Sequence, residues 1–148
     1  MSSFERRFSL HVPSSTENLA MIRDFVSSVG SQAGLAESDR SKVELAVDEA
    51  CANVIEHAYG KDVTKDVIVR ATIETDQITI EVIDTGKGFD PGGVEQKDLD
   101  RLVRERRSGG LGMRMMKALM DEVVYQIVPG EKNELRMVKR LRKENETA

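Results

Sequence analysis

Three polar side chains follow one another at four-residue intervals in the first half of the sequence. Glu49, Asn53 and His57 place a carboxylate, an amide and an imidazole on one face of a helix. Such a row can hold a hydrated Mg²⁺, position a water or accept a proton, because Mg²⁺ prefers oxygen ligands and keeps several waters. A solvated helix face is the ordinary alternative for the row, and a buried structural histidine is the ordinary alternative for His57.

A second motif begins with an acidic residue at the end of a predicted strand. Asp84 offers a carboxylate that can accept a hydrogen bond from an exocyclic amine. Gly86 and Gly88 lack a Cβ atom, so the backbone can pass close to a flat ligand there. Two glycines after a strand also occur in plain turns, so this motif alone leaves the function open.

A third motif, Gly110-Leu111-Gly112, opens a predicted helix. Free backbone N–H groups and the positive end of the helix dipole make such a position a ready anion site. Arg106 and Arg107 precede it and can close over a terminal phosphate. The alternative is a flexible hinge beside a solvated charge cluster. Neither the P-loop spacing nor the dinucleotide-binding fingerprint fits.

The elements that must position these motifs begin with a strand over residues 4–12, which Pro13 places at a sheet edge. Ser14 followed by Glu17 is typical of a capping box. The apolar spacing after it predicts a first helix that ends at about Ser31.

A second helix is predicted from Ser38 or Ser41 to a C-terminal glycine, Gly60. It carries the row of Glu49 and Asn53 beside its apolar face. That apolar stripe consists of Val43, Ala46, Val47, Ala50, Val54 and Ala58.

Strand alternation and turn residues predict the remaining elements. They are a hairpin of residues 67–73 and 78–84 around a turn at 75–77, a loop at 85–109, a short helix at 111–120, and a hairpin of residues 123–128 and 135–141 around a turn at 129–133. This order predicts an α+β fold, a two-layer α/β sandwich with helices on one face of a mostly antiparallel mixed sheet.

Composition bounds the functions that the chain can serve. Its 148 residues fit one domain over 1–148, and a net charge of −4 argues against direct nucleic-acid binding. A single cysteine, Cys51, excludes an intramolecular disulfide and fits a reducing compartment. No apolar run has the roughly 18 residues that span a bilayer, so we expect no membrane association and a cytoplasmic location.

The three motifs together, in this order and at these intervals, resemble the N, G1 and G2 boxes of the Bergerat-fold ATPases, the superfamily of gyrase, heat-shock chaperones and histidine kinases. Within it the chain looks most like the anti-sigma-factor serine kinases of the RsbW type. The residues that carry this likeness are the stretch 49–59, ending in His-Ala-Tyr, with Gly88-Phe89-Asp90-Pro91 and Leu119-Met120-Asp121-Glu122-Val123.

The resemblance implies a role for each motif residue. Asn53 would ligate the Mg²⁺ that bridges the phosphates of ATP, Asp84 would receive the adenine amino group, and Glu49 would be the general base. Residues 89–109 would form an ATP lid, from which Arg106 or Arg107 reaches the γ-phosphate. Backbone contact with the nucleotide would come from Gly86, Gly88, Gly110, Leu111 and Gly112. The chain has one glycine more than the expected Arg-Ser-Gly-x-Gly.

The same resemblance implies a serine/threonine protein kinase that doubles as an anti-sigma factor. It would bind a sigma factor and phosphorylate an anti-anti-sigma antagonist with a STAS domain, and it would form a homodimer. Two alternatives stay open: an ATP-binding regulatory module without catalysis, and a switch kinase or adaptor that acts on a phosphatase. The catalytic half of a histidine kinase fits poorly, because it requires a phosphoacceptor histidine on a helical hairpin.

Overall fold

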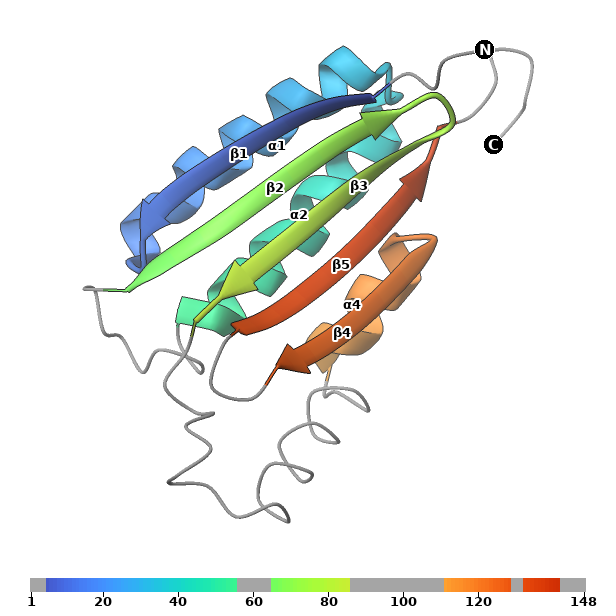
Figure 1. Ribbon diagram of the computed structural model, residues 1–148. Coiled ribbons are helices and arrows are strands. Elements are labelled where there is room, and N and C mark those ends of the chain that lie inside the picture. Colours follow the sequence, from blue (N-terminus) through green and yellow to red (C-terminus); the bar gives the residue numbers. More distant parts are fainter. Residues whose placement is uncertain (1–4, 56–64, 86–110, 129–131, 142–148) are drawn as a thin grey trace.

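The computed structural model describes residues 5–55, 65–85, 111–128 and 132–141 (Figure 1). The predicted order of strands and helices is confirmed. The elements are β1 (Glu5–Pro13), the short 3₁₀ turn η1 (Thr16–Asn18), α1 (Leu19–Ala33), α2 (Glu37–Asn53), β2 (Asp66–Glu74), β3 (Gln77–Asp84), α4 (Leu111–Leu119), β4 (Glu122–Val128) and β5 (Lys132–Arg140).

The five strands form one sheet in the order β1-β2-β3-β5-β4, with β1 at an edge as Pro13 predicts. Every pairing between described strands is antiparallel, so the expected mixed character of the sheet is wrong in this part of the chain. The first hairpin turns at Thr75 and Asp76, and Gln77 already belongs to β3. The β2–β3 and β4–β5 pairs are joined by short turns, which favour antiparallel pairing.

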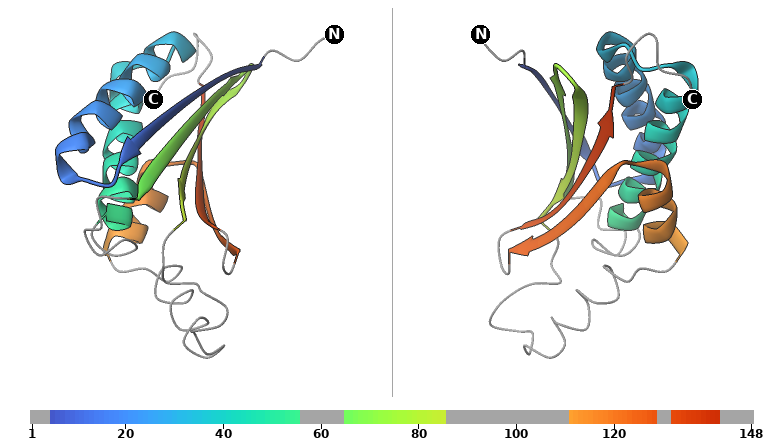
Figure 2. Two further views of the ribbon diagram at one scale, coloured as in Figure 1. Left: turned by 60° about the vertical axis from the view of Figure 1, so that its left-hand side comes forward. Right: turned by 90° about the vertical axis from the view of Figure 1, so that its right-hand side faces the viewer.

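The helices cover one face of the sheet (Figure 2). On that side α1 lies over β1 and β2, α2 lies over β3 and β5, and α4 contacts both α2 and β4. Most apolar residues of β2 and β3 alternate along their strands, which places them on the helix-facing side; Ile68 and Ile83, which pair with each other, lie on the opposite face. Fully buried residues on this face include Val67, Val69, Ala71, Ile78, Ile80 and Val82.

The predicted apolar stripe of α2 forms the other half of this core. Five of its six members are buried, and Ala58 lies outside the described residues. α2 begins at Glu37, one residue before the predicted start at Ser38. The predicted end at Gly60 also lies outside the described residues.

The capping box at the start of the first helix is wrong. The helix begins at Leu19, and neither η1 nor α1 has a side-chain cap. Ser14 is buried instead, its backbone N–H bonds to Lys65 O, and no described residue bonds to its Oγ. The segment after β1 is thus hydrogen-bonded to Lys65, the residue before β2, and not to the first helix.

The end of α1 also differs from the prediction, because the helix continues past Ser31 to Ala33. Gly34 stops it in the left-handed conformation, with φ of 83°. The backbone N–H of Leu35 bonds to Gly30 O and that of Gly34 bonds to Ser31 O. These are the bonds of a Schellman motif, which favours glycine at this position.

The second hairpin has a shorter turn than predicted. β5 begins at Lys132, so Asn133 lies in the strand and pairs with Asp84 of β3. The β3–β5 ladder reaches this pair, which keeps Asn133 out of the expected turn.

The sheet face that lies away from the helices is mainly polar, as is common for antiparallel sheets. It contains an open hollow of about 370 Å³. A hydrogen bond with Glu134 raises the pKa of Glu81 and lowers that of Glu134. The residues that line the hollow include Arg70, Thr72, Thr79, Glu81, Glu134 and Arg136.

A buried ion pair connects the helical layer to the sheet. Lys139 of β5 donates from Nζ to Leu119 O, the last residue of α4, at 2.8 Å. The same Nζ lies 4.0 Å from Oδ1 of Asp39, which is 2% exposed in the first turn of α2. Lys42 Nζ lies 3.9 Å from that oxygen, but its side chain is 42% exposed. One charged group therefore joins α2, α4 and β5.

We expect Lys139→Met to lower the free energy of unfolding by about 3 kcal/mol, because it leaves a buried carboxylate without its buried cation. Lys42→Met removes an exposed partner of the same carboxylate and should cost less than about 1 kcal/mol. Urea unfolding followed by circular dichroism measures both. Equal losses in the two variants would contradict a structural role for the buried pair.

Candidate functional site

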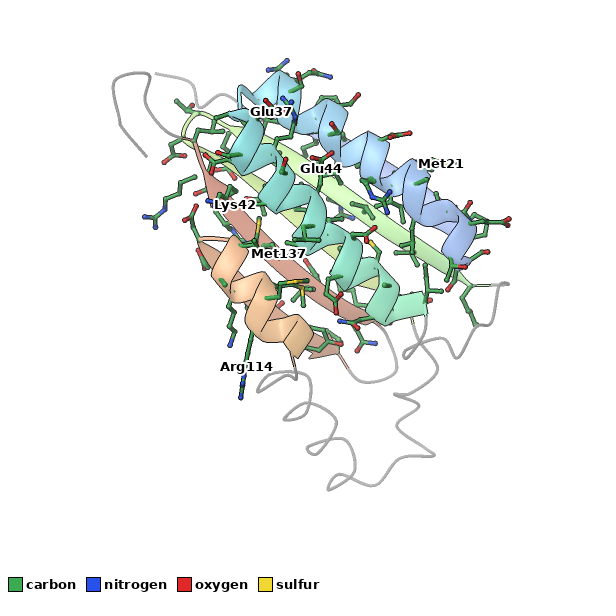
Figure 3. The ribbon with its side chains drawn as sticks, turned by 180° about the vertical axis from the view of Figure 1, so that it is seen from behind. Met21, Glu37, Lys42, Glu44, Arg114 and Met137 are labelled. Carbon is green, nitrogen blue, oxygen red and sulfur yellow. The ribbon has the colours of Figure 1, made fainter. Side chains whose placement is uncertain are left out.

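The predicted site residues that the structure describes lie at one end of the sandwich. Asn53 ends α2, Asp84 ends β3, and Leu111 and Gly112 begin α4. Figures 1 and 3 place these three element ends at the same edge of the molecule. Residues far apart in the sequence thus converge on one region.

Glu49 and Asn53 lie on the flank of α2 that faces α4. They are seven and eleven residues beyond Lys42, so all three share one side of the helix. Lys42 reaches Asp39, and Asp39 lies beside Lys139, whose Nζ bonds to the end of α4. Figure 3 shows α2 between α1 and α4. Both Glu49 and Asn53 are half-buried on this flank.

The neighbouring carboxylate, Asp48, points to the other side of α2. Arg23 of α1 donates from Nη2 to Asp48 Oδ1 at 2.9 Å. This hydrogen bond, together with the charge of Asp48, raises the pKa of Arg23. Of the two consecutive acidic residues, Glu49 is therefore the one placed toward α4.

Asp84 is buried and hydrogen-bonded to a residue that the sequence analysis missed. Asn133 Nδ2 donates to Asp84 Oδ1 at 2.8 Å, and the two residues are 1% and 2% exposed. They stand opposite each other in the β3–β5 register. Both are in phase with the buried positions of their strands, so both lie on the helix-facing side of the sheet.

A signal for Asn133 does exist in the sequence. It precedes Leu135 and Met137 at two-residue intervals, and both of these are buried. A polar side chain in phase with the core positions of a strand is unusual, because a buried polar group requires a partner. The Pro-Gly-Glu-Lys stretch before it resembles a turn and hid this pattern.

The beginning of α4 supplies the third part of the site. The backbone N–H groups of a first helical turn have no partner within the helix, and the helix dipole adds partial positive charge. Leu111 and Gly112 lie in that turn. The turn is therefore suited to bind a phosphate.

Several predicted site residues lie outside the described part of the chain. They stay predictions: His57, Gly86, Gly88, Arg106, Arg107 and Gly110, with the lid at 89–109. No group of three or more metal-ligating side chains occurs among the described residues. This donor set, the Asn53 amide beside the Glu49 carboxylate, suits a Mg²⁺ that takes most of its ligands from phosphates and water.

Cys51 takes no part in this chemistry. It is fully buried in the core face of α2, and burial raises the pKa of its thiol. A thiol that stays protonated is a poor nucleophile.

None of the helices in the described part of the chain is long and apolar enough to cross a bilayer.

Comparison with known families agrees with this geometry. Residues 12–139 match the family described as histidine kinase-like ATPase domain. The chain is 36% identical to serine-protein kinase RsbW of Bacillus licheniformis, covering 80% of this chain and 76% of the relative. It is 32% identical to serine-protein kinase RsbW of Bacillus cereus, covering 97% of this chain and 90% of the relative.

Solved structures show the same fold at lower identity. The chain is similar to the crystal structure of the RsbU and RsbW domains of a Mycobacterium tuberculosis protein, with a TM-score of 0.67 and 18% identity. That match covers 92% of this chain but only 32% of the other. The SiaB–SiaC complex from Pseudomonas aeruginosa gives a TM-score of 0.65 and 16% identity over 88% of each chain.

The family match and the solved structures therefore agree on the architecture of this chain. The chain belongs to the histidine kinase-like ATPase family and, within it, to the RsbW-type serine-protein kinases.

Proposed function

We propose that this protein transfers the γ-phosphoryl group of ATP to a serine or threonine of a STAS-domain antagonist, and that it also binds a sigma factor. The antagonist and the sigma factor would compete for the protein, and phosphorylation of the antagonist would reset the switch. The observation that carries the proposal is the placement of Glu49 on the α4-facing flank of α2, near the end of that helix, which lies at the same edge of the molecule as the end of β3.

Each group in the site has a task that its chemistry suits. The buried Asp84 carboxylate accepts a hydrogen bond from the adenine amino group. The start of α4 receives the phosphates, with Gly86, Gly88 and Gly110 allowing close backbone approach. The Asn53 amide oxygen would hold a hydrated Mg²⁺, which neutralises phosphate charge when it is bound. Arg106 or Arg107 would contact the γ-phosphate.

The transfer step requires one proton acceptor. The hydroxyl oxygen of the partner forms a bond to the γ-phosphorus, and the bond between that phosphorus and the β–γ bridging oxygen breaks. ADP leaves with this bond pair, and Glu49 accepts the hydroxyl proton. Phosphoryl transfer depends mainly on positioning and charge neutralisation, so one well-placed carboxylate is sufficient.

The partner class follows from the resemblance of the motifs to those of the anti-sigma-factor serine kinases. A net charge of −4 favours protein partners over direct nucleic-acid contact. We further propose that the protein acts in the cytoplasm as a homodimer. A module that binds ATP without catalysis is not favoured, because the relatives that match most of the chain are serine-protein kinases.

We expect Glu49→Gln to bind ATP and to lose phosphoryl transfer about 10²- to 10⁴-fold, which is the usual contribution of a general base. The assay incubates the protein with Mg-ATP and each STAS-domain protein of the same genome and records intact masses. Asp48→Asn is the matched control, because its carboxylate faces α1, and it should transfer at the normal rate. Normal transfer by Glu49→Gln would rule out Glu49 as the base. If the unmodified protein transfers phosphate to none of the candidates, the result counts against the proposed function itself.

A second variant tests the base-binding end of the site. Asp84→Asn replaces a charged acceptor with a neutral amide, so we expect ATP affinity to fall about ten- to a hundredfold by titration calorimetry. Asp76→Asn removes an exposed carboxylate at the β2–β3 turn and should leave affinity unchanged. If both variants bind ATP like the unmodified protein, Asp84 does not contact the base.

A further inference from the structure

The end of α4 is held to β5 by directional bonds. Asp121, two residues beyond the helix, donates from its backbone N–H to Val138 O at 2.9 Å. The Oδ2 of Asp121 accepts a hydrogen bond from the backbone N–H of Arg140 at 2.7 Å. Between these two bonds, Lys139 donates from Nζ to Leu119 O at 2.8 Å. Three consecutive residues of β5 therefore hold the end of α4.

Lys139 also reaches the other helix of the site. Its side chain is 9% exposed, and its Nζ lies 4.0 Å from Oδ1 of the buried Asp39, in the first turn of α2. An ammonium group has three protons, so it can bond to a helix end and face a carboxylate at the same time. A cation at the C-terminus of a helix also interacts favourably with the helix dipole. The start of α2 and the end of α4 thus meet at one charged group.

The opposite ends of the same two helices form the candidate site. α2 ends at Asn53, α4 begins at Leu111, and Figure 3 shows the two helices side by side. The buried side chains of Met116 and Met120 set which side of α4 faces the core, but apolar contacts have no direction. The position of α4 along its own axis is therefore left to the hydrogen bonds at its end, about two helical turns from its first residue.

We propose that Lys139 is a positioning residue for phosphoryl transfer. By bonding to the last carbonyl of α4 beside Asp39 of α2, it fixes the first turn of α4 relative to the flank of α2 that carries Glu49 and Asn53. This placement sets the affinity for the phosphates of ATP and the rate of their transfer. The inference rests on the proposed function in one respect, that the phosphates bind at the first turn of α4.

The test removes the charged group and then restores it. In Lys139→Met the end of α4 loses both its side-chain bond and its contact with α2. We expect Mg-ATP affinity, measured by titration calorimetry, to fall about tenfold, because a positioning residue can act on a site that it does not touch. Transfer at saturating Mg-ATP, measured by intact mass, should also fall about tenfold, since small misplacements slow a reaction strongly. Lys139→Arg keeps the charge and the donors, and it should recover most of both losses.

Two controls separate positioning from a loss of stability. Lys42→Met removes the exposed cation beside the same carboxylate, and it should bind and transfer normally. Val26→Ala removes buried methyl groups from α1, which lies over β1 and β2, so it destabilises the core far from the end of α4. All measurements are made at a temperature at which circular dichroism shows the variants to be folded. Under that condition Val26→Ala should keep the ATP affinity of the unmodified protein.

A further variant keeps the test available if Lys139→Met does not fold. Asp39→Asn retains the bond between Lys139 and Leu119 O and weakens only the contact with α2. We expect this variant to lower Mg-ATP affinity by a smaller factor, about threefold.

The outcomes distinguish the inference from the function beneath it. Unchanged Mg-ATP affinity in the folded Lys139→Met and Asp39→Asn variants would overturn the positioning role and leave the proposed kinase standing. An equal loss in Val26→Ala would overturn it as well, because the effect would then follow stability. If the unmodified protein binds no ATP, both the inference and the proposed function fail. A loss in Lys139→Met that Lys139→Arg restores supports the inference.

Discussion

The burial of one sheet face against the helices is the constraint on which the rest of this structure depends. Strand residues alternate between faces, so every second residue of β3 and β5 must be buried. That phase includes Asp84 and Asn133 at the ends of the two strands, where polar groups would otherwise be solvated. Their mutual hydrogen bond, between residues 49 apart in the sequence, is the response to this burial. The Asp84 carboxylate is thus set in place by the same alternation that builds the core.

Sequence patterns predicted the parts of the fold that local burial controls. The stripe of α2 and the alternation of β2 and β3 report burial directly, so these elements were confirmed. The capping box failed because the segment after β1 bonds to Lys65, which no pattern around Ser14 reveals. The turn before β5 is shorter than the sequence predicts for a similar reason, because the start of β5 is set by its pairing with β3.

The candidate site shows the same division between local and distant information. Asp84 and the Glu49–Asn53 row could be predicted because their motifs are continuous in the sequence and specific in combination. The direction in which Glu49 faces, and the separate engagement of Asp48 by Arg23, required the packing of three helices. Asn133 required the register between two strands. Pairings of this kind depend on tertiary contacts, and single-sequence periodicity does not carry them.

The ion pair at the opposite end of the sandwich bears on the site without touching it. Lys139 holds the last carbonyl of α4 and lies beside Asp39 of α2. α4 has nine residues, so its first residue lies about 12 Å from this anchor at the usual helical rise. A short helix is stiff over that length, and fixing one end restricts the angle at which the other end meets α2. The placement of the first turn of α4 relative to Glu49 and Asn53 therefore depends on a buried charge at the other end of that helix.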